Sequence, residues 1–118
     1  MDFYFEEDKP YVNVKINGKE IPPALVDTGS SFTGLPSKLC KELGLKGTGV
    51  RKFGGLCAGE KGIDLPMYSC KIEFLGKTFD SCVVGIPDTL IPLFGRNDLS
   101  NLRINLDWKE RKINAEDC

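Results

Sequence analysis

Short runs of alternating apolar and polar residues recur along the chain and predict a series of short strands. Residues 11–16 alternate in this way, and Asn17-Gly18 follows them, which is a strong signal for a tight hairpin. A double proline at positions 22–23 cannot lie in a central strand, so we expect the next strand to begin at Ala24. The first part of the chain therefore reads as a hairpin followed by a new apolar strand.

One segment has the spacing of a helix. Residues 36–44 begin with Pro36, which suits a first helical turn, and end with Gly44, which suits a helix end. The apolar residues between them share one helical face: Leu39, Cys40 and Leu43. We expect this helix to be structural.

The rest of the chain again predicts strands separated by turns. Strand candidates are residues 47–53, 63–74, 78–84 and 103–107, with a turn or short helix at 98–102 and a final turn at 108–111. The first two flank a glycine-rich stretch, as in a hairpin with a movable tip. The fold class predicted is all-β, a small closed barrel-like domain with one short helix.

Residues 2–8 place an aromatic cluster ahead of an acidic run, and both a pairing strand and a loose arm fit this pattern. We find no long repeat, linker or low-complexity segment, so we expect residues 1–118 to form a single domain.

Charge and composition give no sign of a nucleic-acid or membrane partner. The net charge is -1 with 28% charged residues, so no basic field favours nucleic acid. No run resembles a signal peptide or a membrane span. From the sequence we expect a soluble, cytoplasmic protein.

The five cysteines are odd in number, form no Cys-x-x-Cys pair and have no histidine beside them. Neither a disulfide framework nor a zinc site is favoured. We expect reduced thiols that serve as small apolar residues, and no metal or cofactor.

The candidate chemistry lies at residues 24–31, Ala-Leu-Val-Asp-Thr-Gly-Ser-Ser, where an apolar strand ends in a carboxyl. A partly desolvated carboxyl can hold its proton near working pH, as general acid-base catalysis requires, so Asp27 is the candidate catalytic residue. Hydroxyls at Thr28 and Ser30 can fix the carboxyl plane, and Gly29 permits a sharp turn. The alternative is an Asx-type turn that merely closes the strand.

The glycine-rich stretch also has some features of a phosphate-binding loop, because residues 54–61 roughly mimic Gly-x-x-x-x-Gly-Lys. Glu60 stands where the lysine is needed, and no helix signal follows. A small nucleotide-binding protein is therefore disfavoured.

Asp-Thr-Gly-Ser after an apolar strand resembles the active-site loop of aspartic proteases. Residues 92–97, Pro-Leu-Phe-Gly-Arg-Asn, resemble the segment with which retroviral-type proteases (retropepsins) close their single lobe, and the glycine-rich hairpin lies where that family carries its flap. Three features in this order, over nearly the whole chain, identify the chain as retropepsin-like.

This resemblance implies an acid-protease lobe and an aspartic endopeptidase that works as a homodimer on a peptide or protein substrate. Two carboxyls are needed and the chain has one Asp-Thr-Gly, so Asp27 of each subunit would meet on the two-fold axis. Thr28 would bond across that axis, Gly29 would pass close to the substrate, and Ser30 would donate to the outer oxygen of Asp27. By resemblance, the other substrate-binding residues are Gly54, Gly55, Leu56, Cys57 and Ala58 in the flap. The supporting residues are Leu93, Phe94, Gly95 and Arg96.

The chain departs from the retroviral pattern at two places. The arginine of that segment normally pairs with an acid four residues after the catalytic aspartate, but Ser31 stands there. We expect Arg96 to find another carboxylate, such as Asp98 or one in the acidic N-terminal run, or to stay partly solvated. Residues 116–118 read as a poor strand, so the dimer contacts are expected to differ from the interleaved retroviral termini.

The sequence is compatible with two functions of different classes. The first is the endopeptidase, and the second is a catalytically silent retropepsin-like module for peptide binding or dimerisation. The intact residues 27–30 favour the enzyme, because a binding module has no need of a costly buried carboxyl.

Overall fold

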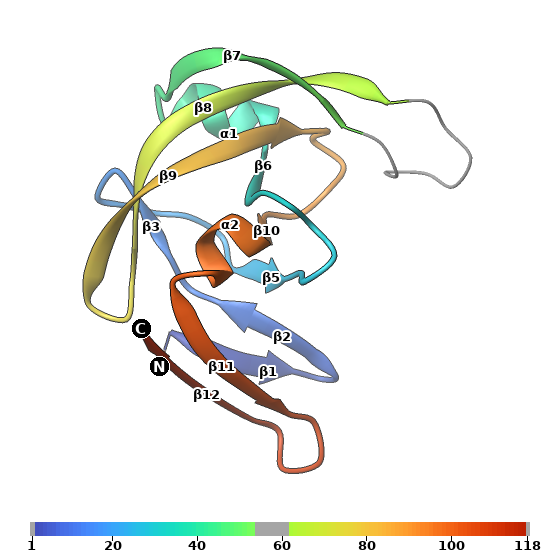
Figure 1. Cartoon of the computed structure of the whole chain (residues 1–118), viewed down its shortest axis with the longest axis vertical. Coiled ribbons are helices and arrows are strands. Elements are labelled where there is room, and N and C mark those ends of the chain that lie inside the picture. Colours follow the sequence, from blue (N-terminus) through green and yellow to red (C-terminus); the bar gives the residue numbers. More distant parts are fainter. Residues whose placement is uncertain (1, 54–61, 118) are drawn as a thin grey trace.

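The computed structural model describes residues 2–53 and 62–117 and is dominated by strands (Figure 1). The N-terminal elements are β1 (Phe3–Glu6), β2 (Lys9–Val12), β3 (Lys15–Ile16), β4 (Lys19–Glu20), β5 (Ala24–Val26), β6 (Gly34–Pro36) and α1 (Ser37–Glu42). The remaining elements are β7 (Lys46–Phe53), β8 (Ile63–Phe74), β9 (Lys77–Ile86), β10 (Leu93–Phe94), α2 (Arg96–Leu99), β11 (Leu102–Asp107) and β12 (Lys112–Asp117).

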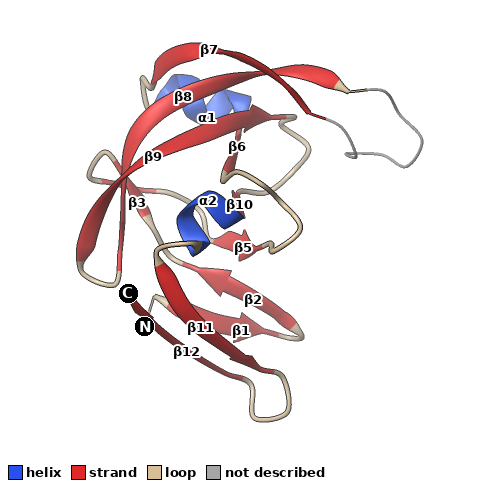
Figure 2. Cartoon of the chain, in the orientation of Figure 1, coloured by secondary structure: helices blue, strands red, loops and turns tan. Residues whose placement is uncertain are grey.

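Most of these strands form one curled sheet with the order β1-β2-β5-β10-β6-β9-β8-β3-β4, and β7 pairs with β8 (Figure 2). β5 and β10 run parallel, as do β6 and β9, whereas β10 and β6 are antiparallel. The short β5 and β10 therefore lie in the middle of the sheet order. The all-β, barrel-like fold predicted from the sequence is confirmed.

The turns between strands follow from local backbone preferences. Asn17 and Gly18 both have positive φ, 50° and 80°, as a tight two-residue turn between β3 and β4 requires. The turn between β8 and β9 has the same character, with φ of 54° at Leu75 and 70° at Gly76. β5 begins at Ala24, directly after the double proline, as predicted.

Helix α1 forms where the apolar spacing indicated. Pro36 is its N-cap residue, and Gly44 follows its end with a positive φ of 64°. Cys40 is fully buried, and Leu39 and Leu43 pack against the main core, so the helix covers the sheet with its apolar face. Neither described helix is long and apolar enough to cross a membrane.

The core is centred on aromatic contacts that connect the N-terminal strand β1 and the long strand β8 to β10. Phe94 of β10 lies edge-on to Phe74 at 5.1 Å and to Phe3 at 6.1 Å between ring centroids. Phe3 belongs to β1, which pairs with β2. The N-terminal residues are therefore a pairing strand and not a loose arm.

The C-terminal residues correct two expectations. β12 extends to Asp117, which lies opposite Leu102 in the β11–β12 hairpin, so the prediction of a poor strand at 116–117 is wrong. Pairing with β11 outweighs the weak strand propensity of these polar residues. The predicted turn or helix at 98–102 lies earlier, because α2 spans Arg96–Leu99 and Leu102 already begins β11.

Candidate active site

The pairing of β5 with β10 in the interior of the sheet fixes the position of Asp27. The Leu25 amide donates to the Pro92 carbonyl at 2.9 Å, and the Asp27 amide donates to the Phe94 carbonyl at 3.0 Å. These bonds continue the parallel pairing of β5 with β10 by one residue beyond β5. The backbone of Asp27 is therefore fixed by the sheet while its side chain is half-buried.

The loop after Asp27 folds back on the carboxylate. The Gly29 amide donates to Asp27 Oδ1 at 3.0 Å, and the Ser30 amide donates to the Asp27 carbonyl at 3.2 Å. This is the Asx-type turn considered as an alternative, so the turn and the candidate catalytic geometry are the same structure. A Cβ at Gly29 would lie 3.3 Å from Asp27 Oδ1, which is a tight contact with the carboxylate.

The hydroxyl of Ser30 does not have the predicted partner. It donates to the Phe32 carbonyl at 2.7 Å, so its single proton is not given to Asp27 in this structure. Thr28 is exposed. The hydrogen bond across a two-fold axis that the resemblance implies for Thr28 stays a prediction.

Gly95 holds the loop against the segment that follows β10. A Cβ at this position would lie 2.3 Å from the Phe32 carbonyl carbon and 2.4 Å from its oxygen, so no larger residue fits without backbone movement. The Gly95 amide also donates to Thr33 Oγ1 at 3.1 Å. The predicted supporting role of Gly95 therefore has a direct steric basis. Phe94 before it is fully buried, and Leu93 is half-buried.

Asp98 is a buried carboxyl directly behind this loop. It is 1% exposed, and its Oδ2 accepts hydrogen bonds from the Thr33 hydroxyl and from Ser81 Oγ, the latter at 3.0 Å. Burial raises the pKa of Asp98, and the hydrogen bonds from Thr33 and Ser81 oppose that rise.

Asn97 joins the same network. Its Oδ1 accepts from the Thr33 amide at 2.8 Å, and its Nδ2 donates to the Cys82 carbonyl at 2.8 Å. Sequence reasoning gave Asn97 no role of its own and considered Asp98 only as a partner for Arg96. The available signals were the place of Asn97 in the segment that resembles retropepsins and the place of Asp98 at the start of the predicted turn.

Arg96 is exposed and bonds to the residue that replaces the expected acid. Its Nη2 donates to Ser31 Oγ at 2.9 Å, and its amide donates to the Ser30 carbonyl at 2.8 Å. The expectation of a carboxylate partner is wrong for the described residues: Asp98 takes hydroxyl donors, and no described acid of the N-terminal run pairs with Arg96. The partly solvated alternative is the one observed.

The base of the β7–β8 hairpin contacts the Asp27 loop through an aromatic cluster. Phe32 lies edge-on to Phe53 of β7 at 5.8 Å, and the Arg51 guanidinium lies over the Phe32 ring, 5.0 Å from its centroid. Both phenylalanines pack on a buried apolar group: Met67, Val84 and Ile86. The predicted flap residues Gly54, Gly55, Leu56, Cys57 and Ala58 lie outside the described residues.

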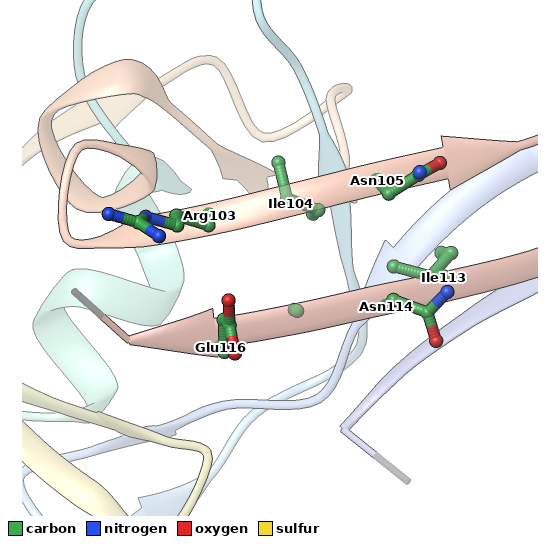
Figure 3. Close-up of a pocket in the computed structure, with 7 residues that line it drawn as sticks. Arg103, Ile104, Asn105, Ile113, Asn114 and Glu116 are labelled. Atoms are coloured by element: carbon green, nitrogen blue, oxygen red, sulfur yellow. The ribbon is translucent and has the colours of Figure 1, made fainter.

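Four hollows lined by described residues lie away from Asp27. One, of about 440 Å³, is on the β11–β12 hairpin between Arg103 and Glu116 (Figure 3). Asp27 lines none of these four. Within residues 2–53 and 62–117, no group of three or more His, Cys, Asp or Glu side chains is placed to hold a metal ion.

The described cysteines are free thiols, and two are deeply buried. Burial raises the pKa of Cys40 to about 11 and that of Cys70 to about 12. Such thiols stay protonated at neutral pH and serve as apolar packing.

Comparison with known proteins agrees with this geometry. A family model described as aspartyl protease matches residues 12–100. No curated protein sequence matches the chain at a significant level. Among solved structures, a retropepsin-like aspartic protease from Rickettsia conorii is 22% identical with a TM-score of 0.67, covering 97% of this chain and 91% of its own. The EIAV protease complexed with the inhibitor HBY-793 is 22% identical with a TM-score of 0.60, covering 82% of this chain and 90% of its own. The chain therefore belongs to the aspartyl protease family and has the retropepsin-like fold.

Proposed function

We propose that this protein is an aspartic endopeptidase that works as a homodimer, with Asp27 of each subunit forming the catalytic pair. The observation that carries the proposal is the placement of Asp27. Its backbone is held by Phe94 in the middle of the sheet, one of its carboxylate oxygens is fixed by the Gly29 amide, and the side chain is only half-buried. A carboxyl that needs only to close a turn has no reason to be held in the centre of a sheet.

The chemistry requires a second carboxyl. Two carboxyls within hydrogen-bonding reach cannot both ionise freely, so they share one proton. The ionised member takes a proton from the attacking water, and the neutral member donates to the substrate carbonyl, as is known for this protease class. Asp98 cannot be the partner in the same chain, because it is 1% exposed and bonded to Thr33 and Ser81. The second acid therefore comes from a second copy of the chain.

The substrate in this proposal is an extended peptide that lies across both Asp27 loops and beneath both β7–β8 hairpins. The hairpin and the loop after β5 project on the same side of the molecule (Figure 1). An extended peptide is held by backbone hydrogen bonds, while pockets read its side chains. Ser30 and residues 54–58 are the proposed contacts on each side.

The experiment that tests this function is hydrolysis of a random peptide library across acidic to neutral pH, beside Asp27→Asn. The amide keeps the shape of the carboxyl but cannot take up a proton, so we expect the variant to dimerise and fold as the wild type does while cutting nothing. Wild-type rates in the Asn variant would exclude Asp27 as the catalytic acid. A folded, inert wild-type dimer that still binds peptides would instead identify a binding module.

A further inference from the structure

Two arginines contact the loop that carries Asp27, and neither forms an ion pair with a described residue. Arg96 reaches the loop from α2 and Arg51 reaches it from β7, and both are exposed. The ion pairs recorded among the described residues are Lys15 with Glu73 and Lys71 with Asp80, which lie on other strands. Two cations therefore flank consecutive residues of the loop, Ser31 and Phe32.

Arg96 is held beside the loop by its backbone as well as its side chain. Its amide donates to the Ser30 carbonyl, and its Nη2 donates to Ser31 Oγ at 2.9 Å. A serine hydroxyl orients the guanidinium without neutralising its charge. The remaining donors of Arg96 are free to meet a carboxylate from outside the chain.

The pleat of β7 directs the Arg51 side chain toward Phe32 in the Asp27 loop. Arg51 and Phe53 are two residues apart, so they share one face of the strand, and both contact Phe32. Lys52 points to the opposite face, where it lies across from Asp64 in register. The face that carries Arg51 therefore looks toward the Asp27 loop.

Within the described part of the chain, little negative charge lies beside these cations. Residues 28–36 contain no charged side chain, and Asp98 behind the loop is buried and already bonded to Thr33 and Ser81. Asp27 itself lies within the catalytic pair of the proposed dimer, where the two carboxyls share a proton. An anionic group beside Ser31 and Phe32 would meet two guanidinium groups that form no ion pair with a described acid.

We propose that the Asp27 site selects peptides that carry an acidic side chain outside the two residues flanking the scissile bond, with Arg51 and Arg96 as the residues that read it. This inference rests on the proposed function, because it places the peptide across the Asp27 loop. The two-fold symmetry of the proposed dimer puts one Arg51–Arg96 pair toward each end of the peptide, so an acid is favoured on either side of the cut.

The test compares peptides that differ only by Glu or Gln. A library first supplies a cleaved sequence, and Glu or Gln is then placed at each outer position in turn. We expect kcat/KM to be about two- to fivefold higher for Glu at the best position, which is the range for exposed ion pairs. Raising the salt concentration to about 0.5 M should reduce that ratio, because exposed charges are then screened.

Matched variants assign the effect to the two arginines. Ser31→Asp places a carboxylate in the chain beside Arg96, so the Glu preference should fall, while Ser31→Asn should retain it. Arg51→Gln should lower the preference, whereas Arg103→Gln, which removes an exposed arginine of β11, should not. The ratio for Glu and Gln is measured within each variant, so a general loss of activity does not mimic the effect.

Equal kcat/KM for Glu and Gln peptides in an active wild type would overturn the acidic preference and leave the protease proposal standing. A preference that persists in both Ser31→Asp and Arg51→Gln would also overturn it. A wild type that cuts no peptide would overturn the proposed function. In that case Glu and Gln versions of a library peptide that the protein binds are compared by fluorescence anisotropy, and equal Kd values would overturn the acidic preference as well.

Discussion

The Thr33 hydroxyl donates a hydrogen bond to the buried carboxylate of Asp98, which lies 65 residues further along the chain. The same hydroxyl oxygen accepts the Gly95 amide at 3.1 Å, and the Thr33 amide donates to Asn97. Thr33 therefore fastens the end of the Asp27 loop to the start of α2 by three bonds. The Thr33 end of the loop is therefore held by hydrogen bonds, while the Asp27 side chain at the other end is half-buried.

Replacing Thr33 by valine tests this attachment. Thr33→Val keeps the shape but removes the donor to Asp98 and the acceptor for the Gly95 amide. Two buried polar groups lose a partner, so we expect the free energy of unfolding to fall by about 2 to 4 kcal/mol in urea denaturation. Thr33→Ser keeps the hydroxyl, so its free energy of unfolding should fall by less. Equal losses in the two variants would mean that the methyl group, and not the hydroxyl, stabilises the loop.

The Asp98 carboxyl should make stability depend on pH. Burial raises its pKa in the folded chain above the ordinary value of 3.8, so the folded chain binds this proton more tightly than the unfolded chain does. Its contribution to stability is then full below the unfolded pKa and is lost as the pH rises through the folded pKa. The measurement is the free energy of unfolding of the wild type minus that of Asp98→Asn. We expect this difference to decrease from about pH 4 toward neutrality, and a difference that is constant or grows would contradict the assignment.

Gly95 should tolerate no side chain. In Gly95→Ala the new Cβ would overlap the Phe32 carbonyl group, so the Asp27 loop must move. We expect the free energy of unfolding to fall by about 3 kcal/mol or more. We also expect peptide hydrolysis to be lost. The matched control is Gly47→Ala on β7, where the nearest atom to a new Cβ is the Met67 carbonyl oxygen at 4.0 Å. If both variants melt at the wild-type temperature, Gly95 is not a steric requirement.

Phe32 should couple the base of the β7–β8 hairpin to the Asp27 loop. Phe32→Ala removes the edge-on contact with Phe53 and the surface beneath Arg51, and we expect about 1 to 2 kcal/mol of destabilisation. Activity of the folded protein should fall as well, measured as kcat/KM under conditions where the chain is fully folded. The control is Phe79→Ala, which breaks the stacked contact with Phe74 within the β8–β9 hairpin. Equal kcat/KM in the two folded variants would show that Phe32 has no specific effect on activity.

The turns and the ends of elements could be predicted wherever local chemistry decides the backbone. Asn17-Gly18 gave a turn with two positive φ angles, and the double proline set the start of β5 at Ala24. Helix α1 followed from apolar spacing and its end residues. The sequence also predicted the β7–β8 hairpin and the position of Asp27 at the end of an apolar strand.

What the sequence did not reveal depends on partners far apart in the chain. Asp98 finds Ser81 and Thr33 only once the fold brings three elements together, and nothing local marks it as buried. The hydroxyl of Ser30 bonds to Phe32 instead of Asp27 because a carbonyl two residues away competes for its single proton. The C-terminal residues form a strand because β11 lies beside them, which intrinsic propensity does not report.

The central claim is that catalysis needs Asp27 from two chains, and the most direct measurement is specific activity against protein concentration. The active species is second order in chain concentration, so activity per subunit should fall on dilution through the dimer dissociation constant, in step with the mass from sedimentation or light scattering. Excess Asp27→Asn chains should inhibit the wild type by forming mixed dimers with a single catalytic acid. A protein that remains monomeric and hydrolyses peptides with constant specific activity at every concentration would contradict the account.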